Sequence, residues 1–286
     1  MFYRSLIGAI ALVAVPCVTI VDARALDDAK YPDLKGQWVR AEGARGVGRF
    51  DPTKPPGRGQ EAPLTAEYQA IYEANLADQA SGGQGIDPTY RCLSPGMPRI
   101  MHAYSPMEFV VTADTTHILI EHIHDSRRIH TDGRDWPADM DDNPMFRGYS
   151  IGRWIDEDGD GRYDVLDAET RHFKGPRAFD ASGLPLAFDN QSVFKERFFI
   201  DKTNPDIIHV LTTVTDNALT RPWTADRQYM RFSEKPVQWP ETWCQEGNAN
   251  VLIGKENYFL RTDGVLMPAK RNQAPPDLRY FNQPQK

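Results

Sequence analysis

Eight short segments in which apolar and polar residues alternate are the feature that most constrains how this chain can fold. They lie between residues 107 and 233 and are rich in β-branched and aromatic residues, with brief turn sequences between them. The segments are MEFVVTA, THILIEHIH, RRIHTDG, YSIGRWI, YDVLDAE, SVFKERFFI, DIIHVLTTVT and DRQYMRFS. A meander of this length hides its unpaired edges most completely when the sheet closes on itself. We therefore predict an all-β protein whose antiparallel meander closes into a barrel, with a two-sheet β-sandwich as the alternative.

The segments that flank this region predict the rest of the architecture. Residues 26–63 are rich in Pro, Gly and charge and predict an extended arm, which is a poor candidate for a core. In LTAEYQAIYEANLADQ, residues 64–79, Thr65 can cap a helix in which Tyr68, Ile71, Tyr72 and Leu76 fall at helical spacing. Residues 64–250 then form one domain of helix plus lipocalin-like barrel. Residues 251–286 form a tail that packs on the barrel, with a strand expected in ENYFLRTDG.

The first 25 residues have the pattern of a secretory signal peptide. Arg4 precedes an apolar run, and small residues at Ala23 and Ala25 form a cleavage site. An uncleaved membrane anchor is the alternative, although Pro16 interrupts the apolar run. We expect a periplasmic or secreted protein with no stable membrane insertion after cleavage.

Cleavage after residue 25 leaves two cysteines, Cys92 and Cys244, in a chain bound for an oxidising compartment. One disulfide between them is the simplest interpretation, and two free buried thiols are the alternative.

Composition excludes several classes of function. The net charge of −7 offers no basic stripe for a nucleic acid or an anionic membrane surface. No G-x-S-x-G, Rossmann glycine pattern or P-loop occurs, which argues against common serine hydrolases and nucleotide enzymes. We expect no organic cofactor, and the oligomeric state is open.

The turn DEDGDGRYD concentrates carboxylates between two predicted strands. Acidic residues alternate along it, and Gly161 permits a sharp turn, as in calcium-binding loops. We predict a structural Ca²⁺ in a strand-loop-strand setting, with a solvated turn that holds no ion as the alternative. The predicted ligands are Asp156, Asp158, Asp160, Arg162, Asp164 and Asp167.

Five motifs in fixed order resemble a large family of exported bacterial proteins, most of them uncharacterised. They are CLSPGMPRIM (92–101), RRIHTDGR (127–134), GYSIGRW (148–154), ERF (196–198) and RPWT (221–224). The family reads roughly C-x-P-x-G-M-P-R, R-x-I-x-T-D-G-R, G-H-S-I-G-R-W-E-G-D-T-L, E-R-F and K-P-W-T. This resemblance covers residues 63–244 and implies a periplasmic β-rich protein, without implying an activity. Tyr149 stands where the family usually has His, and the acidic loop replaces its short E-G-D-T turn.

Two carboxylates fall on predicted apolar strand faces. Glu196 shares a face with Phe194 and Phe198, and Glu121 shares one with Leu119. Inside a barrel they would suit acid-base work on a small molecule, and the alternative is that each forms a buried ion pair with an arginine. The nearby partners are Arg128, Asp132, Arg134, Arg153 and Arg197, so the predicted catalytic set is Glu196, Glu121, Arg134, Asp132, Arg153 and Arg197.

Aromatic and histidine residues add two further candidates. Tyr149, Trp136, Trp154 and Trp223 would bind a ligand near the barrel rims, or would serve as core plugs. His122 and His124 have a spacing that a metal site can use, with His130 across the hairpin, but no third ligand stands at a diagnostic spacing.

Three functions therefore compete. The first is a cofactor-independent lyase, isomerase or hydrolase that acts on an apolar or aromatic small molecule. The second is a lipocalin-like carrier, and the third is a calcium-clamped structural envelope protein. An enzyme needs Glu121 or Glu196 exposed to a cavity, a carrier needs an apolar cavity, and a structural protein needs neither.

Overall fold

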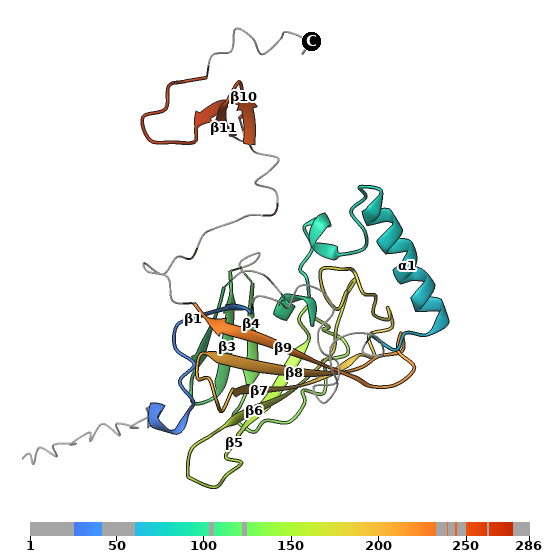
Figure 1. Ribbon diagram of the computed structural model, residues 1–286, viewed down its shortest axis with the longest axis vertical. Coiled ribbons are helices and arrows are strands. Elements are labelled where there is room, and N and C mark those ends of the chain that lie inside the picture. The colour runs from blue at the N-terminus through green and yellow to red at the C-terminus, as the bar shows by residue number, and fades with distance from the viewer. Residues whose placement is uncertain are drawn as a thin grey trace, which may run out of the picture.

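The computed structural model describes residues 26–41, 61–102, 106–121, 125–232, 239, 244, 250–261 and 263–276. Within these residues the chain forms a closed nine-stranded barrel, one α-helix and a separate three-stranded sheet (Figure 1). The prediction of an all-β barrel with one helix is confirmed, and the sandwich alternative is not what the chain adopts. The predicted signal peptide and the pair His122 and His124 lie outside the described residues.

The barrel strands follow one another around the barrel in chain order, and the ninth pairs with the first. The eight alternating segments of the sequence correspond to the second to ninth strands. The strands are β1 Gln37–Arg40, β2 Met107–Val111, β3 Thr115–Ile120, β4 Asp125–His130, β5 Tyr149–Ile155, β6 Val165–Arg171, β7 Val193–Ile200, β8 Ile207–Thr215 and β9 Trp223–Arg231.

One junction departs from the predicted antiparallel meander. Strands β4 and β5 pair in parallel, through Ile129 with Ser150 and His130 with Ile151. All other neighbours in the barrel are antiparallel. A parallel pair needs a long crossover connection, and residues 131–148 supply it. The barrel is therefore mixed, with one parallel seam, at which two residue pairs join the adjacent strands.

The predicted extended arm also contributes a strand. Residues Gln37–Arg40 form β1, which pairs with both β2 and β9 and so closes the barrel. Trp38 is fully buried there, and its indole N–H donates to the Leu34 carbonyl at 3.0 Å. The expectation that this region is a poor candidate for the core was therefore wrong at β1. Four residues are too few to show a period of two, so the strand is recognisable only from its partners.

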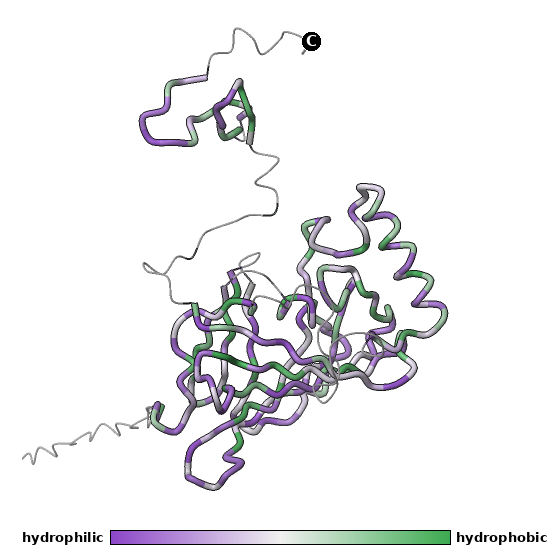
Figure 2. The backbone as a smooth tube through the Cα atoms, viewed as in Figure 1, coloured by the Kyte–Doolittle hydropathy of each residue, from purple (hydrophilic) through white to green (hydrophobic). Residues whose placement is uncertain are grey.

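Large side chains fill the barrel interior. They alternate with outward-facing residues, many of them polar, and Figure 2 shows hydrophobic and hydrophilic residues interleaved there. Several are fully buried, including Trp38, Met107, Ile118, Phe194, Ile208 and Tyr229. The long connection between β6 and β7, residues 172–192, adds Phe173, Phe179, Leu184 and Leu186 to the same core.

Helix α1, Ala66–Ala80, begins at the predicted cap, where the Thr65 side chain accepts from the Tyr68 N–H. Its contact with the body differs from the expected apolar face. Ile71 and Leu76 are about 40% exposed, and the buried residue is Asn75. The Asn75 amide donates to the Ser182 carbonyl at 2.8 Å and accepts from the Ile86 N–H at 2.8 Å. Hydrogen bonds therefore dock the helix on the β6–β7 connection.

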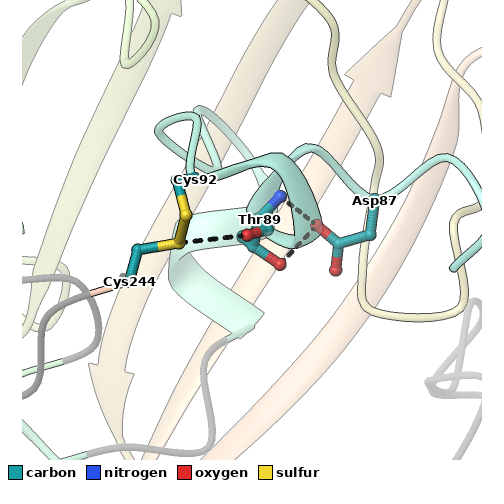
Figure 3. Close-up of a disulfide and its surroundings, with 4 residues drawn as sticks. All are labelled: Asp87, Thr89, Cys92 and Cys244. Carbon is teal, nitrogen blue, oxygen red and sulfur yellow. Dashed lines mark hydrogen bonds between the residues drawn. A yellow bond between two sulfur atoms is a disulfide. The ribbon is translucent and has the colours of Figure 1, made fainter. Parts of the chain in front are cut away.

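The predicted disulfide between Cys92 and Cys244 is present (Figure 3). Cys92 follows a short 3-10 helix, η2 Pro88–Arg91, whose cap is Asp87. The Asp87 carboxylate accepts from the N–H and the hydroxyl of Thr89 and also binds Arg99 at 2.9 Å. The cross-link therefore joins the chain beyond β9 to a hydrogen-bonded turn that is anchored to the core.

The remaining elements are small. The other 3-10 helices are η1 Asp28–Lys30 and η3 Arg99–His102. Strands β10 Asn250–Ile253, β11 Glu256–Leu260 and β12 Leu266–Pro268 form the separate antiparallel sheet, and β11 coincides with the strand expected in ENYFLRTDG. The packing of this segment on the barrel stays a prediction. In the described part of the chain, no helix has the length and apolarity needed to cross a bilayer.

Candidate functional site

A buried ion pair occupies the middle of the barrel. Arg127 of β4 and Glu196 of β7 are each 1% exposed. Arg127 Nη1 donates to Glu196 Oε1 at 3.0 Å, and its Nη2 bonds the other carboxylate oxygen. The same Nη2 donates to the Thr170 hydroxyl at 2.8 Å, which in turn lies 2.8 Å from that of Ser150. Arginine and carboxylate thus form a bidentate pair, supported by hydroxyl groups from β5 and β6.

This geometry favours the architectural alternative for Glu196. The prediction that it faces the interior is confirmed, but the arginine engages both of its oxygens. A carboxylate that is 1% exposed and held at both oxygens by a buried arginine is compensated in charge and shielded from solvent. The partner is Arg127 and not the expected Arg128, which is exposed on the outer face.

Glu121 is buried for a different reason from the one predicted. The inward face of β3 carries Thr116, Ile118 and Ile120, so the expected face with Leu119 was wrong. The strand ends at Ile120, and the Glu121 N–H donates to the Pro106 carbonyl at 3.1 Å as the chain turns. Glu196, by contrast, is bonded to Arg127.

Four polar residues meet on the outside of the barrel, at the seam between β4 and β5. We call Asp132, Arg134, Tyr149 and His130 the outer cluster. Arg134 binds Asp132 through Nε at 2.9 Å and Nη2 at 2.6 Å. Its Nη1 donates to the Tyr149 hydroxyl at 3.2 Å. The Tyr149 ring stacks on His130, with ring centroids 4.9 Å apart and planes 30° from parallel.

Local sequence and register explain this convergence. Because His130 pairs with Ile151, its ring lies beside Tyr149 at the start of β5. The turn TDGR follows β4 at once and brings Asp132 and Arg134 back over the same residues. Gly148 has a φ of +66°, and a Cβ there would lie 2.6 Å from the Arg171 carbonyl oxygen, so a glycine is needed where β5 begins.

Electrostatics divides the outer cluster into charged and neutral members. Hydrogen bonds from Arg134 lower the pKa of Asp132 to about 2, and the same contact raises the pKa of Arg134. Burial, and then the charge of Arg134, lower the pKa of His130 below its ordinary value of 6.5. At neutral pH, Asp132 and Arg134 are therefore an ion pair, and His130 is an uncharged imidazole that can accept a proton.

Of the four predicted ligand-binding aromatics, two lie at this place. Trp136 has its ring 6.2 Å from that of Tyr149, and Arg171 lies over it at 4.8 Å. Trp223 is 2% exposed and packs on Phe179. Trp154 is half-buried and donates its indole N–H to the Thr116 hydroxyl at 3.1 Å. Trp223 and Trp154 therefore have the alternative role as core residues.

Two hollows flank the outer cluster. The larger, which we call the outer groove, has a volume of about 590 Å³ and runs over the outer face of β5–β9. Arg134 is one of the residues that line this groove, and Ile151 and Leu211 contribute apolar surface to it. The smaller, which we call the seam pocket, has a volume of about 250 Å³ and is lined by His130 and Tyr149 among others.

The two remaining predicted catalytic arginines lie along the outer groove and not beside Glu196. Arg153 is exposed on β5 and lines the groove. Arg197 lies 3.2 Å from Asp167 and also pairs with Glu157 of the acidic turn. The carboxylates of Asp167 and Glu157 therefore already compensate the charge of Arg197.

The acidic turn connects β5 and β6 and is the hairpin loop at the bottom of Figure 1. Oxygens from Asp156, Asp158 and Asp164 lie within 4.8 Å of one another and could hold a cation. Asp160 and Asp167 are not in this group. Asp160 accepts from the Arg162 N–H, and Asp167 pairs with Arg197. The structure thus brings together three of the six predicted ligands.

Sequence reasoning placed two functional residues poorly. The sequence pattern does not identify Arg127 as the partner of Glu196, and it indicates His130 only as a metal ligand. Alternation with the fully buried Ile129 would have placed Arg127 inside. The position of His130 beside Tyr149 depends on the parallel pairing of β4 and β5, and no local sequence pattern predicts that pairing. Comparison with known proteins adds no identity, because no protein-family model and no curated protein matches the chain.

Proposed function

We propose that the protein binds an apolar or aromatic small molecule in the outer groove, with its reactive end reaching past Arg134 to His130 and Tyr149 of the seam pocket, and transforms it there by cofactor-independent acid-base chemistry. The observation that carries this proposal is the arrangement of Arg134, which joins Asp132 to Tyr149 beside the neutral imidazole of His130. Titratable groups with shifted pKa values beside a hollow are typical of reactive sites.

Each member of the outer cluster has a distinct role in this proposal. His130 accepts a proton from the bound molecule, because its lowered pKa keeps it neutral. The Tyr149 hydroxyl donates a proton or a hydrogen bond, and Arg134 orients it. Asp132 holds Arg134 in place, and Trp136 offers a flat apolar wall. Such a set suits a lyase, an isomerase or a hydrolase that works by proton transfer.

The site proposed here lies outside the barrel, whereas the sequence pointed to an interior cavity. Side chains fill the interior around the pair of Arg127 and Glu196. A second candidate function is a carrier that uses the same groove without chemistry. Apolar lining by Ile151 and Leu211 favours it, since apolar walls bind apolar ligands without any need for a titratable group.

The setting of this function is part of the proposal. We propose an exported protein of the periplasm or the medium that is related to the bacterial family its motifs resemble. The disulfide between Cys92 and Cys244 supports an oxidising compartment. The outer cluster draws its residues from two of those motifs, RRIHTDGR and GYSIGRW.

A structural Ca²⁺ in the acidic turn is a separate proposal. The three converging carboxylates of Asp156, Asp158 and Asp164 support it, because calcium prefers hard oxygen ligands and like charges this close repel without a cation. Its role would be to clamp the hairpin of β5 and β6.

The experiment is a thermal-shift screen of aromatic esters, lactones and enones, followed by mass spectrometry of each hit after incubation with the protein. We expect hits that stabilise the wild type and are converted to a new product. The variant His130→Gln should lose conversion by roughly 100-fold, the usual scale for a general base, while it still binds. Tyr149→Phe should show a similar loss.

Tyr90→Phe is the matched control, because Tyr90 is 58% exposed and is not part of the outer cluster. It should leave both binding and conversion unchanged. Binding without any conversion by the wild type would favour the carrier. Hits whose binding and turnover are the same in all three variants would place the site elsewhere and reject the proposal.

A further inference from the structure

We infer that the ligand of the outer groove is a monocarboxylate, and that Arg153 is the residue that binds its carboxylate. This inference rests on the proposed function, because it names the substrate class of the same site. Arg153 then determines specificity, while the outer cluster carries the chemistry.

The charges around the groove single out Arg153. Arg134, Lys195 and Arg197 also line it, and each has a carboxylate partner: Asp132 at 2.6 Å, Glu169 at 3.7 Å and Asp167 at 3.2 Å respectively. Within the described residues, Arg153 has neither an ion-pair nor a hydrogen-bond partner. It is therefore the cation at the groove that is left for an anion from outside.

Strand register explains why Arg153 is unpaired. Its neighbour across the β5–β6 ladder is Asp167, which would be the natural partner. Asp167 is also opposite Arg197 on β7, and the ion pair forms on that side. Arg153 is thus the one groove cation without a carboxylate partner among the described residues, and one unpaired arginine matches a ligand with a single negative charge.

Distance along β5 sets the length of the ligand. Tyr149, Ile151 and Arg153 alternate with Ser150, Gly152 and Trp154 and share the outer face. Four residues along a strand span about 13 Å, with Ile151 midway. A carboxylate held by Arg153 therefore places an acyl chain or aryl ring over Ile151 and directs the far end of the molecule toward Tyr149. An acid about 10 Å long fits this spacing and the groove volume of about 590 Å³.

The composition of the groove agrees with such an amphiphile. Ile151 and Leu211 offer apolar surface for the chain, and the guanidinium can hold a carboxylate through two parallel hydrogen bonds. A guanidinium also binds phosphate well, so the anion itself has two sources, and a binding experiment has to separate them.

The test is isothermal titration of the full mature chain with two isosteric probes, 4-phenylbutyrate and its neutral primary amide, and with inorganic phosphate as a third ligand. We expect wild type to bind the acid about tenfold more tightly than the amide, in line with a charge-assisted hydrogen bond at an exposed site.

Arg153→Gln should reduce this ratio to about one without changing amide affinity, and Arg153→Lys should keep part of it. Arg221→Gln, which removes an exposed arginine outside the groove, should keep the full ratio.

Several results would overturn the inference. Equal affinity of wild type for acid and amide, a preference that survives in Arg153→Gln, or absence of binding at millimolar concentration would each reject the carboxylate role. Phosphate that binds as tightly as the acid would assign a simple anion site instead. If Leu211→Arg, which alters the groove lining, leaves the affinity for both probes unchanged, the ligand lies elsewhere and the proposed function fails as well. If Leu211→Arg lowers the affinity for both probes while wild type binds the acid no more tightly than the amide, only the carboxylate inference fails.

Discussion

Arg127 and Arg128 show how much depends on a single position in a strand. They are adjacent in RRIH, so one must face the interior and the other the solvent. Ile129 is fully buried, and alternation puts Arg128 on its opposite side and Arg127 in the barrel. Because Ile129 faces the interior, Arg127 and not Arg128 lies on the side of the strand that contacts Glu196. Both residues offer the same charge, and within the part of the chain that the structure describes only Arg127 has a carboxylate partner.

Glu196→Gln should destabilise the protein without a specific effect on ligand binding. The change removes the charge that compensates Arg127, which is 1% exposed, and leaves a buried cation unpaired. Loss of one partner of a buried pair costs about 3–5 kcal/mol. Urea unfolding followed by circular dichroism measures this loss in the free energy of unfolding.

The double variant Arg127→Met with Glu196→Leu is the control for that measurement. Replacement of both partners by apolar groups leaves no unpaired charge, so much of the lost stability should return. A Glu196→Gln variant with unchanged stability but no conversion of a substrate would make Glu196 a functional residue after all.

His209 should make stability depend on pH on the alkaline side. Its ring nitrogens lie 2.9 Å from Asp226 and 3.1 Å from Asp201, and the hydrogen bond with Asp226, opposed in part by burial, raises its pKa above 6.5. Because the folded state binds this proton more tightly than the unfolded state, the stabilisation is complete below about pH 6.5 and is lost as pH rises through the raised pKa. Urea unfolding at about pH 6 and about pH 8.5 should show a smaller fall for His209→Gln than for wild type. Parallel falls in the two proteins would contradict this assignment.

At the scale of single elements, helix α1 and strand β3 show how far periodicity identifies a buried face. Tyr72 of α1 packs against the core as its helical spacing allows. Helix α1 begins at its predicted cap, but its docking residue is Asn75, and Ile71 and Leu76 remain partly exposed. Strand β3 turns its other face inward and ends before Glu121. Periodicity indicates that a face exists, whereas the partner that covers it decides which face is buried.

The hairpin of β5 and β6 makes the calcium proposal testable. Calcium should raise the melting temperature of wild type by roughly 5 °C or more relative to chelator, since ligand that binds only the folded state stabilises it. Asp158→Ala should abolish this rise, because it removes one of the three converging carboxylates. Differential scanning fluorimetry with calcium and with chelator measures both effects.

Asp160→Ala is a matched control from the same turn. Its carboxylate accepts from the Arg162 N–H at 2.8 Å and is not among the three that converge. The calcium-dependent rise should therefore remain in this variant. A wild type that melts at the same temperature with and without calcium would identify the turn as a solvated loop.

At the scale of the whole molecule, two long-range pairings matter. One closes the barrel, and the other brings the residues of the proposed site together. Strand β1 joins β9 to β2, and the disulfide then connects the chain beyond β9 to the turn that carries Cys92. The crossover between β4 and β5 makes these strands parallel and sets His130 against Tyr149. Neither pairing is local. Strands β1 and β9 lie at opposite ends of the barrel region in the sequence, and the crossover of residues 131–148 separates β4 from β5.

The sequence by itself determined the elements that depend on neighbours along the chain. The period-two segments became β2–β9, Thr65 capped α1, and Asp132 met Arg134 within one turn. Two cysteines in a chain predicted to be exported were enough to predict their disulfide. These features follow from short-range sterics, alternation and the small number of available partners.

Tertiary structure alone decided the rest. It converted a four-residue piece of the arm into the closing strand, chose Arg127 as the partner of Glu196, and moved the candidate site from the barrel interior to its outer face. It also left Arg153 without an ion-pair partner among the described residues, because Asp167 pairs with Arg197. The physical reason is the same in each case. Pairing across strands, unlike alternation along one strand, is settled by register and by competition among charges that meet only after the sheet has closed.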